Sequence, residues 1–239
     1  MELIYLYHSG FALLGDGFTV IWDYFEDSIS SRSGIVHDEL LKREGRLYVL
    51  SSHAHADHFN KEIMNFRKEH SDTVYIFSRD ILRGRKALKE DAVWLRKGEV
   101  YQDECLRIRA FGSTDIGISF LMEVEGKKIF HAGDLNNWHW MDESEEEEWK
   151  GYEQNYLHEL NVLYKFTSAL DVAMFPVDPR LGTEYMRGAC QFVEKIKTSI
   201  FVPMHFDEAY GKAEEFLPIA LQYGAKMPVI RMRGQKIAL

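Results

Sequence analysis

The sequence predicts one α+β domain spanning residues 1–239, in which two β-sheets pack together with helices on their outer faces. Three observations lead to this prediction. The N-terminal part contains short runs of Ile, Val, Tyr and Phe separated by glycine turns, the last third alternates between strand-like and helix-like segments, and no linker or internal repeat divides the chain. Two sheets with helices outside give both patterns a place around one core.

The first part is expected to begin as an antiparallel meander, followed by a buried strand that leads into a histidine-rich segment. Asn60 is a suitable N-cap for the helix after that segment, and Ser78 for the next helix. The predicted elements are, in order, strands over 3–7, 11–14, 18–22 and 47–50, a helix over 61–70, a strand over 74–77 and a helix over 79–89.

The middle of the chain is β-rich and ends in an acidic run at 142–148. Aromatic and aliphatic residues follow this run at helical spacing, which predicts a long amphipathic helix whose acidic first turn suits the helix dipole. The predicted strands of this part and of the last third cover 106–110, 118–124, 128–130, 170–175, 199–202, 229–232 and 237–239, and the later helices cover 183–197 and 212–223.

The composition is that of an ordinary globular protein, because 46% of the residues are hydrophobic and 28% are charged. It excludes intrinsic disorder, a fibrous repeat and a disulfide-stapled miniprotein. The net charge of −9 argues against nucleic acid as the main partner, since phosphate binding needs a surplus of Lys and Arg. A small anionic substrate held by one or two local cations is compatible with this charge.

Two cysteines, Cys105 and Cys190, lie far apart and outside any C-x-x-C pair, so we expect free thiols in a reducing cytoplasm. The N-terminus, MELIYLYHSG, lacks the basic region and the cleavage site of a signal peptide. No uncharged apolar run approaches the ~20 residues of a membrane helix. We therefore expect a cytoplasmic protein with no membrane partner.

The strongest chemical signal is S-H-A-H-A-D-H at 52–58, which places three imidazoles and a carboxylate directly after a hydrophobic strand. His53 and His55 are two residues apart, so in an extended backbone they point to the same side. A turn can then bring Asp57 and His58 to a second point nearby. Imidazole and carboxylate suit Zn, Mn or Fe. A solvated polar loop does not explain the small alanines between these donors, so the segment predicts a metal centre.

The segment H-A-H-A-D-H resembles the H-x-H-x-D-H signature of the metallo-β-lactamase superfamily. F-H-A-G-D, ending at Asp134, and V-P-M-H, ending at His205, are similar to later landmarks of that family and occur in the same order. Y-H-S-G-F from Tyr7, with W-D at 22–23, resembles the branch that contains ascorbate-6-phosphate lactonase. The resemblance covers nearly the whole chain and implies a four-layer αββα sandwich with metals at one edge between the sheets.

The resemblance also implies a metal-dependent hydrolase with two divalent ions, Zn or Mn, with Fe as an alternative. A metal-bound hydroxide would attack a small anionic ester, lactone or phosphodiester. Asp57 would orient this hydroxide and Asp134 would bridge the ions, which makes these two carboxylates the candidate catalytic residues. The implied ligands are His53 and His55 for site one, Asp57, His58 and His205 for site two, and Asp134 for both.

One landmark of the family is missing, because the stretch F-G-S-T-D-I-G at 111–117 contains no third histidine for site one. We favour Asp115 as its replacement, since a carboxylate oxygen is a competent ligand. His131 is a rival, but it lies three residues before Asp134 and would face the other side of a straight strand. Alternatively, site one is weak and partly occupied, or water completes it. An oxygen ligand here increases the weight of Mn or Fe against Zn.

Four residues are candidates for substrate binding. Trp138 and His139 follow Asp134 and form either a wall and polar contact of the pocket or a packed cap. Asp178 and Arg180 lie where a strand turns into a helix, and Arg180 either grips an anionic group or braces the turn through Asp178.

His8 and Asp23 follow two early strands and form either a polar support behind a metal ligand, with Asp23 orienting an imidazole, or a structural pair. Two other functions are considered for the whole protein: a nuclease-type phosphodiesterase, and a non-hydrolytic iron sensor or redox protein. The substrate, the native metal and the oligomeric state are left open by the sequence.

Overall fold

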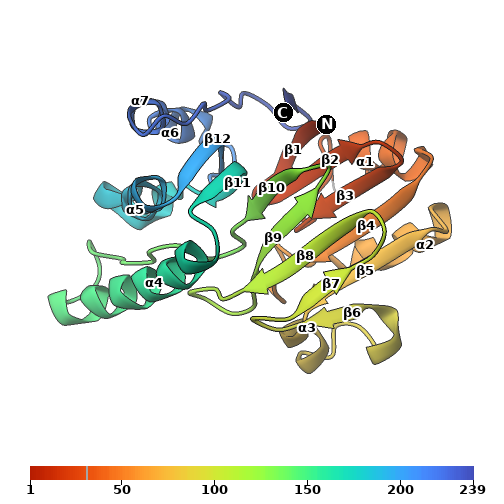
Figure 1. The fold of residues 1–239 in the computed structure, drawn as a ribbon, viewed down its shortest axis with the longest axis horizontal. Helices are drawn as coiled ribbons and strands as arrows, with labels where there is room; N and C mark the ends of the chain where they lie inside the picture. The colour runs from red at the N-terminus through yellow and green to blue at the C-terminus, as the bar shows by residue number, and fades with distance from the viewer. Residues whose placement is uncertain (31) are drawn as a thin grey trace.

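The computed structural model describes residues 1–30 and 32–239 and consists of two sheets packed face to face, with helices on both outer sides (Figure 1). The strand order is β13-β1-β2-β3-β4-β5-β6 in the first sheet and β12-β11-β10-β9-β8-β7 in the second. Helices α1 to α3 lie against the first sheet and α4 to α7 against the second. The predicted αββα sandwich is therefore confirmed.

The first sheet begins as the predicted antiparallel meander of β1, β2 and β3, and continues with parallel pairing from β3 to β6. Its strands are β1 (Glu2–Tyr7), β2 (Gly10–Gly15), β3 (Phe18–Trp22), β4 (Arg46–Ser51), β5 (Thr73–Ser78), β6 (Val93–Leu95) and β13 (Lys236–Ala238). The helical segments of this half are α1 (Ile35–Asp38), η1 (Leu40–Lys42), η2 (Lys61–Asn65), α2 (Phe66–Glu69), α3 (Arg79–Arg83) and η3 (Lys89–Asp91).

In the second sheet, β10, β11 and β12 are parallel, whereas β7 to β10 pair antiparallel. Its strands are β7 (Val100–Gln102), β8 (Leu106–Phe111), β9 (Ser119–Val124), β10 (Lys127–His131), β11 (Ala169–Pro176) and β12 (Lys197–Met204). The helical segments are α4 (Glu146–Phe166), η4 (Pro179–Glu184), α5 (Arg187–Lys195), α6 (Tyr210–Glu214) and α7 (Leu217–Gln222). Among the described residues, no helix combines the length and apolarity needed to cross a membrane.

Side chains alternate between two apolar clusters along the first sheet. Leu3 and Tyr5 belong to the large cluster that includes the second sheet, α4 and α5. Ile4 and Leu6 belong to a smaller cluster under α1, α2 and α3. The central strands are thus buried on both faces, which explains why they are continuous hydrophobic runs in the sequence.

The predicted strands agree with the structure except at 229–232, which is not a strand, and the short strands β6 and β7 were not predicted. The predicted long amphipathic helix with an acidic first turn is confirmed as α4. The other predicted helices are shorter or split. Asn60 does cap its helix by accepting the Glu62 N–H at 2.9 Å, but the first turns are 3₁₀. Ser78 makes no capping hydrogen bond, and its helix ends at Arg83.

Two later helices are interrupted by residues that cannot continue a regular helix. The helix predicted over 183–197 begins only at Arg187, because Gly182 has φ 79° within η4. The helix predicted over 212–223 is divided into α6 and α7, and Pro218 stands in the first turn of α7. Cys105 and Cys190 are free, as predicted.

The polar side chains of the site all follow strands that end at one edge of the sandwich. His8 lies between β1 and β2, Asp23 follows β3, the 52–58 segment follows β4, Asp134 follows β10 and His205 follows β12. Since parallel strands end on the same side of a sheet, the topology alone brings these segments together.

Gly117 lets the chain approach the histidine segment closely. It has φ 86°, and a Cβ built there would collide with the Ser52 carbonyl oxygen and the His53 Cβ. Gly126 has φ 75° in the turn between β9 and β10, with open space around a built Cβ. The two glycines share a positive φ but differ in the space around them.

We expect Gly117→Ala to lower the free energy of unfolding by about 2–4 kcal/mol, because left-handed strain and steric overlap both act there. Gly126→Ala should cost about 1–2 kcal/mol, since only the strain acts. Urea unfolding of the metal-free variants measures both values. Equal losses in the two variants would contradict the close approach.

Candidate metal centre

Eight side chains form two adjacent clusters of metal-ligand type, and in each cluster one donor atom per residue lies within 4.8 Å of the others. The first cluster consists of His8, Asp57, His58 and His205, and the second consists of His53, His55, Asp115 and Asp134. The structure therefore brings together the implied ligands and Asp115, leaves out the rival ligand His131, and adds His8.

Asp134 lies between the two clusters. Its Oδ1 is 3.1 Å from Nε2 of His58 and 3.3 Å from Nε2 of His205, which belong to the first cluster. Its Oδ2 is 3.3 Å from Nε2 of His53, which belongs to the second. The carboxylate thus faces both clusters with different oxygens, as a bridging ligand requires.

The histidine segment is held by hydrogen bonds to its backbone. The buried carboxylate of Asp23 accepts the Ser52 N–H at 2.7 Å and the Ser52 hydroxyl at 2.6 Å. The Ala54 N–H donates to Asp80 at 2.8 Å, and the Lys86 ammonium donates to the Ala54 carbonyl. These contacts fix the loop independently of any metal.

Carboxylates also orient two imidazoles of the first cluster. Nδ1 of His58 donates to Asp23 at 2.7 Å, and Nδ1 of His205 donates to Asp178 at 2.8 Å. In both rings Nε2 is then directed toward Asp134. Burial alone would lower the pKa of both histidines, but the neighbouring carboxylates outweigh it and raise the pKa of each.

The donor atoms of this site fit a divalent metal ion. Nε2 of His58, Nε2 of His205 and Oδ1 of Asp134 are buried, and none has a hydrogen-bond partner within the described chain. Leaving buried polar atoms unpaired costs about 1–3 kcal/mol each. Because these atoms converge, one cation can serve several of them at once. The mixture of imidazole and carboxylate suits Zn, Mn or Fe.

The second cluster is more open to solvent than the first. The His55 and Asp115 side chains are 52% and 42% exposed, whereas His53 is fully buried. Asp115 Oδ2 lies 3.5 Å from His55 Nδ1. Burial and the charge of Asp134 raise the pKa of Asp115, and burial together with His58 lowers the pKa of His53 to about 4. Both shifts favour the uncharged forms of Asp115 and His53 when no cation is bound.

Left-handed backbone at ordinary residues is concentrated around this edge. His8, Asp23, His205 and Asp207 have φ between 42° and 66°, and Trp140 in the neighbouring loop has φ 46°. Each such conformation costs of order 1 kcal/mol for a residue with a Cβ. The surrounding hydrogen bonds hold these residues in place. Strained backbone of this kind is expected where the direction of the side chains is needed for function.

A cavity of about 400 Å³ opens above the clusters. Trp138 forms part of its wall: its Nε1 donates to the Asp134 carbonyl at 2.9 Å, and its ring stacks with Trp140 at 6.5 Å. Asp57 and Arg180 also line the cavity, and the guanidinium of Arg180 is half exposed while pairing with Asp178 at 2.6 Å.

A family model described as a beta-lactamase superfamily domain matches residues 2–150. The chain belongs to the metallo-β-lactamase superfamily. A UPF0173 metal-dependent hydrolase from Korarchaeum cryptofilum is 23% identical over 244 residues and covers 98% of this chain and 96% of its own. The prediction of a metal-dependent hydrolase is confirmed at the level of this class.

Two solved structures show the same fold. Igni18, a metallo hydrolase from Ignicoccus hospitalis, has a TM-score of 0.68 at 17% identity and covers 99% of this chain and 97% of its own. CmlA, a diiron β-hydroxylase from Streptomyces venezuelae, has a TM-score of 0.67 at 12% identity and covers 100% of this chain and 54% of its own.

The 112–117 loop contains no histidine and carries Asp115 into the second cluster. Thr114 holds this loop by donating to the Asn136 carbonyl at 2.5 Å. The rival ligand His131 lies outside both clusters. Its Nε2 donates to the Ser9 carbonyl at 2.8 Å and its ring stacks on Trp22, so it is a buried structural residue.

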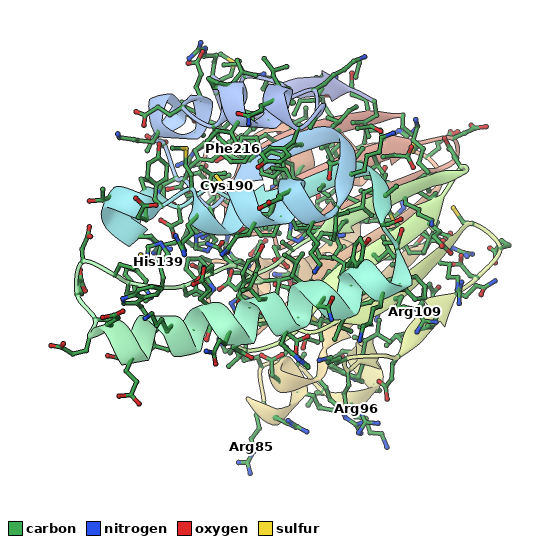
Figure 2. The ribbon with its side chains drawn as sticks, turned by 60° about the vertical axis from the view of Figure 1, so that its left-hand side comes forward. Arg85, Arg96, Arg109, His139, Cys190 and Phe216 are labelled. Carbon is green, nitrogen blue, oxygen red and sulfur yellow. The ribbon has the colours of Figure 1, made fainter. Side chains whose placement is uncertain are left out.

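Two candidate substrate-binding residues do not line the cavity. His139 is buried among the side chains between α4 and α5 (Figure 2), where its Nε2 donates to the Glu184 carbonyl and its Nδ1 accepts the Met141 N–H, both at 3.1 Å. It braces the loop. Asp178 is buried behind His205, and hydrogen bonds from His205 and Arg180 overcome the effect of burial and lower its pKa to about 2.

Three residues of the site were missed or given a lesser role from the sequence. His8 was predicted either to support a ligand or to form a structural pair, and Asp207, which the sequence does not connect with His8, pairs with its ring at 2.7 Å. Tyr152 lines the cavity from α4, where it was seen only as part of an amphipathic pattern. In the sequence, His8 could have been noticed only through the Y-H-S-G turn, and Asp207 only because it follows V-P-M-H-F.

We expect Asp23→Asn to weaken metal binding 10–100-fold, because loss of a group that hydrogen-bonds the other ring nitrogen of a ligating histidine lowers metal affinity by this amount. Competition with a chromogenic chelator measures the affinity. Asp27→Asn is a matched control, because Asp27 is equally buried and accepts hydrogen bonds from the 36–37 backbone and from His37, outside both clusters. The control should lose stability but keep its metal affinity. Equal metal affinities of the Asp23 and Asp27 variants would contradict the role of Asp23.

Proposed function

We propose that this protein is a two-metal hydrolase that cleaves a small anionic ester, lactone or phosphodiester. The observation that carries the proposal is the placement of Asp134, whose two oxygens face different imidazole clusters beneath an open cavity. His53, His55 and Asp115 would hold one ion, and Asp57, His58 and His205 the other, with Asp134 shared. The metals are proposed to be Zn or Mn, with Fe as an alternative.

A divalent ion held by these residues would lower the pKa of bound water toward neutrality and would polarise the substrate oxygen. Asp57 lines the cavity, and although burial alone would raise its pKa, His8 and His58 lower it below the ordinary value. Its ionised carboxylate can therefore accept a hydrogen bond from the nucleophile and orient it. The Asp134 side chain is nearly buried, and the residue lies in the turn that follows β10.

The cavity wall supports a substrate with a flat or apolar part. The stacked rings of Trp138 and Trp140 form one side, and Tyr152 lies on the same cavity. Arg180 supplies a cation at the rim, but Asp178 already neutralises much of its charge. This favours a substrate with a single carboxylate or phosphate and disfavours a polyanion. We accordingly propose a small-molecule substrate, no nucleic-acid partner and a cytoplasmic location. The net charge of −9 supports the absence of a nucleic-acid partner.

A second candidate is a non-hydrolytic iron protein with redox activity on the same scaffold. The carboxylate of Asp115 makes the second cluster richer in oxygen ligands, which suits iron. One solved structure that shares the fold is a diiron β-hydroxylase. The resemblance to the ascorbate-6-phosphate lactonase branch supports hydrolysis of a lactone or ester instead.

The test is a panel of aryl and methyl esters, lactones, phosphodiesters and structured RNA, offered to protein loaded with Zn, Mn or Fe. We expect metal-dependent hydrolysis of a small ester, lactone or phosphodiester, with aryl substrates preferred. Asp134→Ala should lower kcat/KM by about 10³-fold or more, since both ions lose a ligand. Asp72→Ala, at an exposed ion pair with Arg46, is the control and should leave kcat/KM unchanged.

Undiminished hydrolysis by Asp134→Ala would overturn the proposed centre. Robust cleavage of RNA would overturn the small-molecule assignment. Inactivity on the whole panel, together with iron-dependent consumption of oxygen, would favour the redox candidate.

A further inference from the structure

Three imidazoles of the first cluster share one arrangement. In each, Nδ1 faces a carboxylate at hydrogen-bond distance, whereas Nε2 is buried and has no hydrogen-bond partner within the described residues. The pairs are His58 with Asp23 at 2.7 Å, His205 with Asp178 at 2.8 Å and His8 with Asp207 at 2.7 Å. A carboxylate at one nitrogen fixes the tautomer and directs the other nitrogen toward a metal. His58 and His205 match implied ligands, but His8 does not.

His8 is held where its ring must face the other two. It has φ 56° in the turn between β1 and β2, and its carbonyl accepts the His205 N–H at 3.1 Å. The ring centroids of His8 and His205 are 3.9 Å apart, and those of His8 and His58 are 5.6 Å apart. Nε2 of His8 lies 3.4 Å from Oδ2 of Asp57, in a side chain that is 3% exposed.

We propose that His8 is a metal ligand, so that the first cluster is a site of three imidazoles and the Asp57 carboxylate. This inference rests on the proposed function, since it assigns one more ligand to the same centre. Asp207 is a positioning residue that acts through the His8 ring. In the alternative, Nε2 of His8 would serve only as the partner of Asp57, but the two atoms are 3.4 Å apart and Nε2 makes no hydrogen bond there.

The two sites then differ in affinity. The first offers three imidazoles that are at most 3% exposed, each oriented by a carboxylate. The second offers two imidazoles and carboxylates, and the His55 and Asp115 side chains are each about half exposed. Preorganised and buried nitrogen ligands bind Zn²⁺ and Co²⁺ more tightly than exposed oxygen ligands. The first site fills first, and its ion is the last to be removed.

The test is a Co²⁺ titration of the metal-free protein, followed by the visible absorption of the bound ion and by equilibrium dialysis. Wild type should bind in two steps that differ at least tenfold in affinity. His8→Gly suits the positive φ and should weaken the tighter step 10–100-fold while leaving the weaker step in place. Added imidazole should restore the tighter step by occupying the vacated space. His8→Gln, which fills that space, should show the loss without rescue.

His37→Gln is the matched control. Nδ1 of His37 also pairs with a buried carboxylate, Asp27, at 2.8 Å, and its Nε2 is also buried without a hydrogen-bond partner, but it lies outside both clusters. Its Co²⁺ titration should match wild type. Asp207→Asn, at a half-exposed position, should give a smaller loss than His8→Gly.

A wild-type affinity and spectrum in both His8→Gly and His8→Gln would overturn the ligand role and leave the proposed function intact. A wild-type protein that binds no Co²⁺ would overturn the proposed metal centre itself, and His8 with it. Equal weakening in the His37 variant would assign the effect to general loss of stability and would also overturn the inference.

Discussion

The nearly buried carboxylate of Asp134 is the constraint around which the site is built. A buried negative charge is costly unless opposite charges or donors surround it. Here Asp134 faces His53, His58 and His205, which follow the ends of two different strands. The imidazoles hold the pKa of Asp134 well below its ordinary value even though burial acts in the other direction. A cation between these groups would stabilise the Asp134 carboxylate in place of the imidazoles. The pKa values of His58 and His205 are raised, so binding of the cation would displace protons from these rings.

A second layer of carboxylates determines where the imidazoles point. Asp23, Asp178 and Asp207 each occupy the Nδ1 side of one ring, and each follows a strand end of the sandwich or lies within three residues of one. Asp23 also binds the Ser52 backbone, so one buried side chain fixes both a ring and the loop that carries it. The apolar core on both sides of the first sheet keeps these strand ends in register.

The sequence predicted the elements that depend on local pattern. Strands with continuous apolar runs were recognised because they are buried on both faces, and the H-A-H-A-D-H segment was recognised because its donors are contiguous. His8 was not predicted as a ligand, since its relation to His58 and His205 exists only after β1 and β12 meet at one edge. Helix boundaries failed where single residues decide them, as at Pro218 and Gly182. His139 looked like a pocket residue from its neighbours, but the backbone around it uses both ring nitrogens.

Anomalous diffraction from crystals grown with saturating Zn²⁺ or Mn²⁺ tests the two-metal centre most directly. We expect two peaks about 3.5–4 Å apart. One peak should lie against His58 and His205, the other against His53 and Asp115, with the Asp134 carboxylate between them. Peaks only at surface sites, or no peak within reach of Asp134, would contradict the two-metal centre.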